Sequence, residues 1–329
     1  MLLLNRNGGK RRVNYRRLGK TGLKVSEICL GCMTFGGQAD EETSIAIIDH
    51  ALESGVNFLD TADVYTRQRS EAIVGKALKG RRDKVVLATK VRGRVGEDVN
   101  DVGLSRKHIM QGVEDSLRRL QTDYIDLYQV HSWDPETPIE ETLSTLDDLV
   151  RQGKVRYIGC SNFAAWQLCK ALWASDVHNW VRFDSIQPRY NILDKRIEAE
   201  LLPLCADQGI GVVVYSPLAG GVLTGKYRRG EGAPEGSRFA LRGGRQVQSA
   251  LSDSNLAAVQ RLGEVAAARG KSVGQLALAW VLANPTVSSA INGATSVAQF
   301  VENLGALEIS LTEDELAACA EAATIARRG

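Results

Sequence analysis

Gly55-Val-Asn-Phe-Leu-Asp60-Thr-Ala-Asp-Val-Tyr65 is the stretch of sequence from which the fold can be worked out. A short apolar run ends in the carboxylate of Asp60, and a tyrosine follows five residues later. This pattern is typical of a buried strand that delivers polar side chains to one edge of a sheet. Other apolar runs of the same kind indicate which fold this strand belongs to.

Eight apolar runs in all predict strands. They are Ile28–Gly31, Val56–Asp60, Val85–Lys90, Tyr124–His131, Val155–Asn162, Phe183–Gln187, Gly211–Ser216 and Ser288–Asn292. Near-continuous apolar runs are expected when both faces of a parallel sheet are buried. The runs therefore favour a parallel sheet that is covered by other elements.

Helical periodicity fills most of the intervals between these runs. The predicted helices are Glu41–Ser54, Ser105–Leu120, Pro138–Gln152, Ala164–Ala174, Arg196–Gln208, Leu256–Arg269, Val273–Ala283, Val297–Gly305 and Thr312–Ala326. Strands that alternate with helices, with no linker or shift in composition, predict one (β/α)8 TIM barrel over residues 15–329. A β-hairpin at Tyr15–Ser26 precedes it, extra helices end it, and residues 1–14 read as a flexible basic extension. A doubly wound open sheet is the alternative.

Composition excludes several classes of protein. The 329 residues carry a formal net charge of +2, whereas proteins that bind nucleic acids or membrane surfaces usually need a clear basic excess. No apolar run approaches the roughly 20 residues of a membrane span. Cys29 and Cys32 form a C-x-x-C, but it lies in a strand pattern and no second pair has zinc spacing, so no metal is expected. We expect a reduced, cytoplasmic protein, and a monomer and a homo-oligomer both remain open.

Polar residues end most of the predicted strands. In a barrel these positions share the C-terminal rim, where active sites are built. The residues are Asp60, Lys90, His131, Ser161, Asn162, Gln187, Ser216 and Asn292. A carboxylate, a lysine and one of only four histidines on the same rim indicate catalysis.

The rim predicts a proton donor next to a carbonyl. A tyrosine has an ordinary pKa near 10 and donates poorly at neutral pH unless its phenolate is stabilised. Lys90 could supply that stabilisation to Tyr65, and Asp60 could hold the lysine charged. His131 could orient a carbonyl oxygen, and a cofactor would supply hydride. Two alternatives remain: a lyase that uses Lys90 as a Schiff base, and a cofactor-bound regulatory or scaffold subunit with little turnover.

Several motifs, taken together, resemble the aldo-keto reductase superfamily. They include the opening stretch, Ala-Thr-Lys90, Gln-Val-His131, Gly-Cys-Ser161-Asn162, Ile-Gln187-Pro, Tyr215-Ser-Pro-Leu-Ala-Gly-Gly and Asn292-Gly-Ala-Thr-Ser-Val-Ala-Gln299-Phe-Val-Glu302-Asn303. The branch looks like the bacterial enzymes related to potassium-channel β subunits. The resemblance implies a catalytic set of Asp60, Tyr65, Lys90 and His131 and a small-molecule aldehyde or ketone substrate. The β subunits have asparagine at the position of His131, which favours a working reductase here.

The resemblance also implies a nicotinamide dinucleotide. No G-x-G-x-x-G follows a strand, and the phosphate-loop-like Gly220-x-x-x-x-Gly225-Lys226 is followed by Tyr227 where a phosphate loop needs Ser or Thr. NADP is favoured and NAD remains possible, because an arginine common near Thr295 in relatives is absent. The implied cofactor residues are Met33, Gln38, Asp60, Ser161, Asn162, Gln187, Tyr215, Ser216, Pro217, Leu218, Gly220, Lys226, Arg238, Gly293, Thr295, Gln299, Glu302 and Asn303.

Two regions complete the predicted site. Loop residues near Tyr65 and His131 are expected to line the substrate pocket with them: Phe35 and Trp133. Between Tyr227 and Asp253 lies the longest irregular stretch, rich in glycine and arginine. A loop this long in a compact domain is usually functional or disordered, and we expect it to fold over the cofactor pyrophosphate.

Overall fold

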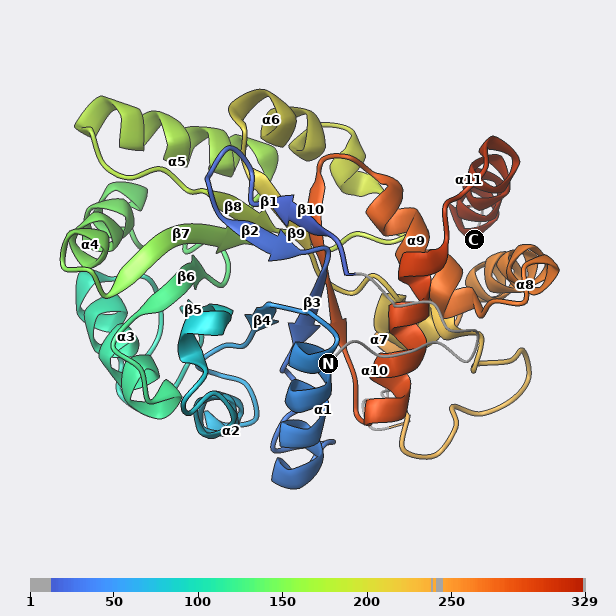
Figure 1. Ribbon diagram of the computed structural model, residues 1–329. Helices are drawn as coiled ribbons and strands as arrows, with labels where there is room; N and C mark the ends of the chain where they lie inside the picture. Colours follow the sequence, from blue (N-terminus) through green and yellow to red (C-terminus); the bar gives the residue numbers. More distant parts are fainter. Residues whose placement is uncertain (1–12, 238, 241–244, 328–329) are drawn as a thin grey trace.

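Eight parallel strands close into a barrel in the computed structural model, which describes residues 13–237, 239–240 and 245–327 (Figure 1). Around the barrel the strands follow the order β10-β3-β4-β5-β6-β7-β8-β9. Their bounds are β3 Ile28–Gly31, β4 Phe58–Asp60, β5 Val86–Val91, β6 Ile125–Val130, β7 Val155–Ser161, β8 Ser185–Gln187, β9 Gly211–Val214 and β10 Val287–Gly293. The predicted (β/α)8 barrel is confirmed, and the open sheet is wrong.

The α-helices lie outside the ring of strands (Figure 1). They are α1 Glu41–Glu53, α2 Arg69–Ala77, α3 Arg106–Leu120, α4 Ile139–Arg151, α5 Ala165–His178, α6 Leu201–Gln208, α7 Arg245–Ala250, α8 Asp253–Ala268, α9 Val273–Ala283, α10 Val297–Leu304 and α11 Glu313–Arg327. Short 3-10 turns lie at η1 Arg82–Lys84, η2 Arg196–Glu198, η3 Ala219–Thr224 and η4 Gly305–Glu308.

Two helices were not predicted. The crossover helix α2 is only nine residues long, so it is too short to show clear periodicity. The helix α7 interrupts the stretch predicted to be irregular between Tyr227 and Asp253. The predicted helix Arg196–Gln208 is divided into η2 and α6. The predicted N-cap Ser105 is confirmed, because its side chain accepts a hydrogen bond from the backbone of His108.

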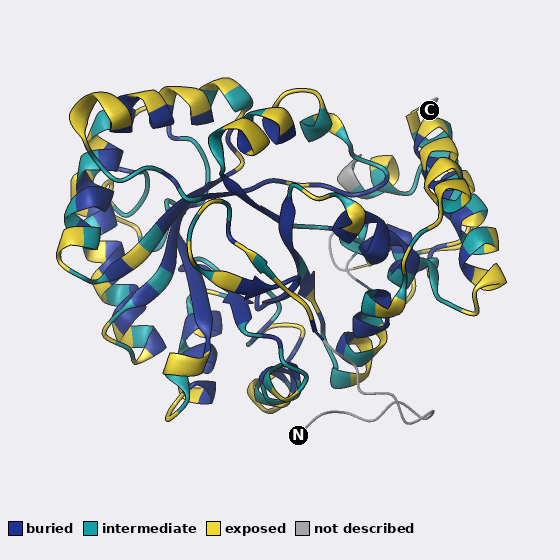
Figure 2. Ribbon diagram, turned by 45° about the horizontal axis from the view of Figure 1, so that its top comes forward, coloured by how far each residue is buried: buried dark blue, intermediate teal, exposed yellow. Residues whose placement is uncertain are grey.

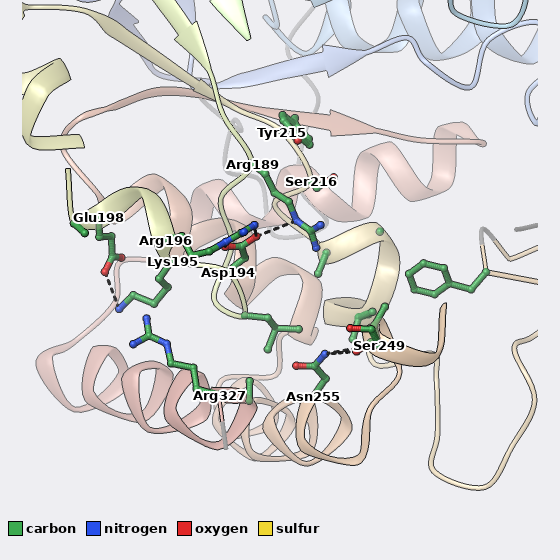
Figure 3. A pocket seen from close by; sticks show the side chains of 18 residues that line it. Arg189, Asp194, Lys195, Arg196, Glu198, Tyr215, Ser216, Ser249, Asn255 and Arg327 are labelled. Carbon is green, nitrogen blue, oxygen red and sulfur yellow. Dashed lines mark hydrogen bonds and ion pairs between the residues drawn. The ribbon is translucent and has the colours of Figure 1, made fainter. Parts of the chain in front are cut away.

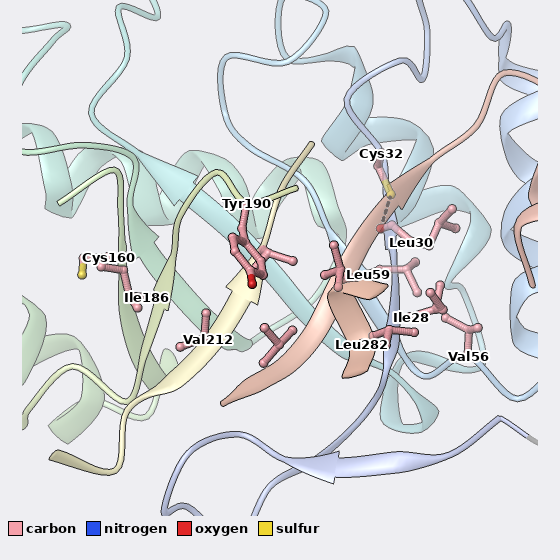
Figure 4. Close-up of a cluster of buried hydrophobic side chains, with 14 of the residues drawn as sticks. Ile28, Leu30, Cys32, Val56, Leu59, Cys160, Ile186, Tyr190, Val212 and Leu282 are labelled. Atoms are coloured by element: carbon pink, nitrogen blue, oxygen red, sulfur yellow. Dashed lines mark hydrogen bonds between the residues drawn. The ribbon is translucent and has the colours of Figure 1, made fainter. Parts of the chain in front are cut away.

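Side chains on each strand alternate between the barrel interior and the helices. In β4, Phe58 packs in an interior cluster with Val86 and Leu127, whereas Leu59 packs in the larger cluster beneath the helices. Figure 4 shows part of this larger cluster, and Figure 2 shows that buried residues form the strands and the inner faces of the helices. The alternation continues to the C-terminal rim, so Asp60, two residues after Phe58, faces the interior.

The hairpin of β1 (Tyr15–Arg17) and β2 (Lys24–Ser26) lies at the other end of the barrel. Leu18 and Val25 are completely buried in the interior cluster. At Gly19 a Cβ atom would come within 2.4 Å of the carbonyl oxygen of Gly209, so only glycine allows this close approach. The hairpin therefore plugs the end of the barrel that carries no active-site candidates.

Val13 and Asn14, the last two residues of the predicted N-terminal extension, lie within the described part of the chain. Val13 is buried, and the Asn14 side chain donates to a Glu27 carboxylate oxygen at 3.0 Å, so both pack against the barrel. Residues 1–12 lie outside the described part of the chain. Within the described part, no helix is long and apolar enough to span a membrane.

The two cysteines of the C-x-x-C lie on opposite sides of the barrel wall. Cys29 belongs to the interior cluster, and Cys32 belongs to the cluster under the helices. Both are free thiols, and burial raises their pKa well above its ordinary value. Among the described residues no group of histidine, cysteine and carboxylate side chains could hold a metal ion.

Candidate active site

A cavity of about 680 Å³ opens at the C-terminal ends of the strands. This volume lies in the range of small-molecule and cofactor sites. The residues of the sequence prediction that line it are Met33, Gln38, Asp60, Tyr65, His131, Ser161, Asn162, Gln187, Tyr215, Ser216, Pro217, Leu218, Gly220, Lys226, Gly293, Thr295, Gln299, Glu302 and Asn303. Arg238 lies outside the described residues. Other lining residues include Gly31, Thr34, Gly221, Thr224, Gly236, Ser272, Gly274 and Asn292.

Three of the predicted catalytic residues are in direct contact. The ammonium of Lys90 donates to Asp60 Oδ1 at 2.5 Å and to the hydroxyl of Tyr65 at 3.2 Å. It also donates to the backbone carbonyl of Thr61 at 2.8 Å. Lys90 is completely buried and Asp60 is nearly so. The lysine thus links the carboxylate to the tyrosine, and each of its three N–H groups has an acceptor.

The contact with Asp60 keeps Lys90 positively charged. Burial opposes the charge, but Asp60 and Tyr65 outweigh it and raise the lysine pKa above its ordinary value. A Schiff-base lysine must instead lose its proton to act as a nucleophile. The buried, paired ammonium therefore argues against the lyase alternative.

Tyr65 remains protonated at neutral pH. Burial raises its pKa, and although the charge of Lys90 acts in the opposite direction, it does not cancel this effect. The ring of His131 meets the ring of Tyr65 edge-on, with centroids 5.8 Å apart. Burial, followed by the charges of Lys90 and Arg92, lowers the pKa of His131 to about 3. Tyr65 can therefore donate a proton, and neutral His131 can only orient an oxygen.

Two glutamines hold the second oxygen of Asp60. Gln187 Nε2 donates to Asp60 Oδ2 at 2.8 Å, and Gln129 Nε2 donates to the same oxygen at 3.1 Å. Gln187 Nε2 also reaches Gln129 Oε1 at 3.2 Å. A carboxylate only accepts hydrogen bonds, so it determines the orientation of both amides. Two groups of these amides then remain for other partners: the second N–H of Gln129 and the carbonyl oxygen of Gln187.

Sequence reasoning missed Gln129. It lies within β6, two residues before His131. Side chains two residues apart on a strand point to the same side, so Gln129 faces the barrel interior as His131 does. This spacing could have identified Gln129 from the sequence, because a polar side chain that faces a closed barrel interior needs a hydrogen-bond partner.

Replacing Gln129 with methionine is expected to lower the free energy of unfolding by about 1–3 kcal/mol, because it removes a donor from a buried carboxylate and an acceptor from Gln187. Urea unfolding measures the change. The control is Gln152→Met, at an exposed position at the end of α4. Equal losses in the two variants would show that Gln129 contributes nothing to the buried network.

Residues from three strand ends brace one side of the cavity. Ser161 Oγ donates to the backbone carbonyl of Gln187 at 2.8 Å, and Asn162 Nδ2 donates to the carbonyl of His131 at 3.0 Å. The hydroxyl of Tyr215 donates to Asn162 Oδ1 at 2.7 Å. This chain of contacts holds the Tyr215 ring at the cavity wall.

The turn after β9 supplies main-chain groups and a lysine. Its residues Ser216, Ala219, Gly220 and Gly221 have positive φ angles of 53°, 50°, 69° and 102°. Such turns can aim successive N–H groups at one point and bind anions. The Lys226 ammonium lies over this turn, because a Cβ atom on Gly221 would come within 3.3 Å of its Nζ. The turn and Lys226 can therefore hold a phosphate.

The opposite end of the cavity carries paired amides. Asn303 Nδ2 donates to Asn292 Oδ1 at 3.0 Å. Asn292 Nδ2 is buried and has no hydrogen-bond partner in the described structure. Thr295 donates through both its backbone and its hydroxyl to Gln299 Oε1, each at 3.0 Å. An unpaired donor on the wall indicates that this end is built to contact a polar ligand.

Two predicted substrate residues do not line the cavity. Phe35 is completely buried, so it cannot meet a substrate unless the core opens. Trp133 packs edge-on against Phe163 and is tilted against Trp166. Both residues pack against other side chains in this structure, and their contact with a substrate stays a prediction.

Asp63, between Asp60 and Tyr65, is a buried carboxyl with no hydrogen-bond partner for either side-chain oxygen in the described structure. Burial, followed by the charge of Glu71, raises its pKa to about 7. A raised carboxyl pKa means that the folded state holds the proton more tightly. Stability is thus lost as the pH rises from the ordinary carboxyl pKa to about 7.

We therefore expect Asp63→Asn to be more stable than the wild type at pH 8, with an advantage about 2 kcal/mol larger at pH 8 than at pH 5. Urea unfolding at the two pH values measures the difference. Asp123→Asn, at an exposed position, is the control. If the difference in free energy of unfolding between Asp63→Asn and the wild type were the same at both pH values, the raised pKa of Asp63 would be contradicted.

A second, larger cavity of about 1350 Å³ lies beside the first (Figure 3). It shares Tyr215, Ser216 and Gly220 with the first cavity. Its cations are largely paired. Arg196 binds both oxygens of Asp194 at 2.8 Å, and Arg189 approaches the same carboxylate at 3.4 Å. We assign the chemistry to the smaller cavity because it contains the Tyr65–Lys90–Asp60 contacts.

Proteins similar to this chain include ones named as oxidoreductases and as channel subunits. Residues 27–324 match the Aldo/keto reductase family. The chain is 41% identical over 303 residues to a "Probable voltage-gated potassium channel subunit beta" of Oryza sativa subsp. japonica, covering 90% of this chain and 92% of that protein. It is also 41% identical over 315 residues to the "Uncharacterized oxidoreductase YrpG" of Bacillus subtilis (strain 168), covering 92% and 94%.

A third relative is the "Versiconal hemiacetal acetate reductase" of Aspergillus parasiticus, 36% identical over 336 residues, with 92% of this chain and 95% of that protein covered. The oxidoreductase and reductase names support carbonyl reduction as the general class of reaction. The family match spans nearly the whole barrel. This chain therefore belongs to the aldo/keto reductase family.

Proposed function

We propose that this chain is an NADPH-dependent reductase that converts aldehydes and ketones to alcohols, with Tyr65 as the general acid. The observation that carries the proposal is the contact of Lys90 with both Asp60 and Tyr65, at the wall of a cavity. The family match agrees with it.

Groups that would suit a nicotinamide dinucleotide line the cavity, which supports the cofactor part of the proposal. The amide oxygen of Gln187 accepts no hydrogen bond within the described part of the chain and could accept one from a carboxamide, and the Tyr215 ring could stack on a nicotinamide. The turn at Ser216–Gly221 and Lys226 suit the pyrophosphate. Asn292 Nδ2, buried and unpaired, suits the adenosine end. The bound cofactor would supply hydride to the carbonyl carbon.

The protein residues would act on the carbonyl oxygen. In this proposal Tyr65 donates a hydrogen bond to that oxygen and gives up its proton as hydride arrives at the carbon. Lys90, 3.2 Å from the hydroxyl, stabilises the phenolate that forms. Neutral His131 donates a second hydrogen bond that orients the substrate, and Asp60 keeps Lys90 charged and in place.

NADP is proposed over NAD. The hydroxyls of Thr295 and Ser296, at the start of α10, are the groups that could meet a 2′-phosphate at the adenosine end of the cavity. The Ser296 side chain caps α10 by accepting from Gln299, and the Thr295 hydroxyl donates to Gln299. A 2′-phosphate would accept hydrogen bonds from these two hydroxyls, with the Thr295 hydroxyl turning to it from Gln299.

The test follows the loss of NADPH absorbance with aldehydes, methylglyoxal and keto sugars, and repeats each assay with NADH. We expect turnover with at least one carbonyl class and a higher kcat/KM for NADPH. Tight NADPH binding without turnover across the panel would contradict the reductase. It would favour a cofactor-binding subunit with little turnover; two plant relatives are named as potassium channel β subunits.

A further inference from the structure

Gln129 connects the two halves of the proposed site from a completely buried position. It lies on β6, where the barrel register aligns it with Lys90 on β5. Its amide nitrogen donates to Asp60 Oδ2 at 3.1 Å, and its amide oxygen accepts from Gln187 Nε2 at 3.2 Å. One buried amide therefore contacts both the carboxylate beside Lys90 and a residue predicted to bind the cofactor.

The barrel leaves room for this side chain at Gly159. Gly159 lies on β7, between β6 and β8, and is aligned with Gln129 on one side and with Ser185 on the other. A Cβ atom at this position would come within 3.2 Å of Gln129 Cγ and within 2.6 Å of Ser185 Oγ. The glycine therefore provides the space in which the Gln129 side chain extends toward Gln187 on β8.

Toward the proton donor, Gln129 helps to hold Asp60 as a carboxylate, because hydrogen bonds to a carboxylate favour its ionised form. Asp60 Oδ2 accepts from the amides of Gln129 and Gln187. Asp60 Oδ1 accepts from the Lys90 ammonium, which also contacts the Tyr65 hydroxyl at 3.2 Å. Gln129 is thus linked to the proposed general acid through Asp60 and Lys90.

Toward the cofactor, Gln129 fixes the amide plane of Gln187. The Gln187 nitrogen donates to Asp60 at 2.8 Å and to Gln129 at 3.2 Å, which occupies both of its N–H groups. With Asp60 as the sole acceptor, the amide could rotate about that single hydrogen bond, and the second acceptor prevents this. Since Gln187 lines the cavity, its amide oxygen is the group left for a ligand there.

We propose that Gln129 is a positioning residue that acts on both halves of the reaction. It holds Asp60 beside Lys90, and it fixes Gln187 so that the Gln187 amide oxygen is presented to the carboxamide of a nicotinamide. The inference rests on the proposed function, which supplies the cofactor and the reaction. An amide is required at this position, because one side chain must donate to a carboxylate and accept from an amide at the same time.

The first test compares the binding of NADP with that of 2′-phospho-ADP-ribose, which is NADP without the nicotinamide ring. If the wild type prefers NAD, then NAD and ADP-ribose take their place. Calorimetry measures both dissociation constants. Gln129→Met should weaken NADP binding by roughly 3- to 10-fold, the equivalent of one hydrogen bond, and leave 2′-phospho-ADP-ribose binding unchanged. Equal weakening of both ligands, or no weakening of NADP, would overturn the proposed hold on Gln187.

Two further variants separate the hydrogen bonds from a disturbed interior. Gln129→Glu at pH 6 is the rescue, since a protonated carboxyl donates to Asp60 through its O–H and accepts from Gln187 through its carbonyl oxygen. Burial and Asp60 favour that protonated form, and Lys90 opposes it. Ser185→Ala is the control, because it removes a buried hydroxyl that has no partner in the described structure. Both variants should bind NADP as the wild type does, and a loss in either that equals the loss in Gln129→Met would contradict the proposal.

A double-variant cycle tests the link to the proton donor. Gln129→Met alone should lower kcat for carbonyl reduction by roughly 3- to 10-fold. In the Tyr65→Phe background the same substitution should have little effect on kcat, because its contribution passes through the Tyr65 hydroxyl. An equal fall in kcat in both backgrounds would mean that Gln129 only supports the fold, and it would overturn this half of the proposal.

The binding measurement also separates this inference from the proposed function. If the wild type binds NADP but reduces no carbonyl compound, the reductase is rejected, whereas the comparison of NADP with 2′-phospho-ADP-ribose still decides whether Gln129 fixes Gln187. Carbonyl reduction by the wild type, with NADP affinity and kcat unaltered in Gln129→Met, would support the reductase and reject the role of Gln129.

Discussion

Replacing Tyr65 with phenylalanine is expected to lower the rate of NADPH-dependent carbonyl reduction by about 10²- to 10⁴-fold, the usual contribution of a positioned general acid. The variant removes only the hydroxyl that Lys90 contacts at 3.2 Å. Because the ring remains, the substrate should still reach the cofactor. The loss should therefore appear in kcat more than in KM.

The assay follows NADPH absorbance under single-turnover and steady-state conditions. Tyr15→Phe is the matched control, since it also removes one tyrosine hydroxyl, which donates to the Gly55 carbonyl at 2.7 Å in the hairpin region. That variant should retain the wild-type rate. Rates for Tyr65→Phe equal to the wild type would reject Tyr65 as the acid, even if reduction itself is observed.

The second large effect concerns stability. Lys90→Met should lower the free energy of unfolding by about 3–5 kcal/mol, because it leaves the Asp60 carboxylate buried without its counter-charge. The distance from Lys90 Nζ to Asp60 Oδ1 is 2.5 Å, and the two side chains are 0% and 3% exposed. Urea unfolding of the wild type and the variant measures the difference.

A double variant separates the charge from the packing. Asp60→Asn in the Lys90→Met background removes the unpaired charge while keeping the shape, so part of the loss should be recovered. Lys76→Met is the surface control, since Lys76 and Glu41 are paired but half exposed, and exposed pairs contribute at most about 1 kcal/mol. A loss as small as that of Lys76→Met would mean that Asp60 is not held as a charge.

Much of the candidate site could be predicted from the sequence because strand parity is a local property. Asp60, Lys90, His131, Ser161 and Gln187 each end an apolar run, and each lies at the cavity wall or beside it in the structure. Parallel strands in a closed barrel bring such ends to one rim. Neither the short helix α2 nor the packing of Phe35 and Trp133 has a comparable local signal.

The direction of the Tyr65 pKa was not accessible from the sequence. The presence of Lys90 suggested a phenol that loses its proton more easily. In the structure burial outweighs the lysine, and the pKa is raised. Burial depends on every element around the ring, whereas the lysine contribution depends on one neighbour.

The sequence by itself determined the barrel, its rim and the residues of the proposed proton donor, since these follow from periodicity and from polar residues at strand ends. The tertiary structure alone decided that Gln187 on β8 reaches Asp60 on β4 across the barrel, with Gln129 between them. It alone buried the Nε of Arg92 without a hydrogen-bond partner in the described structure, at a backbone φ of 134°. These contacts join residues far apart in the chain, so they exist only once the barrel has closed and its register has been set.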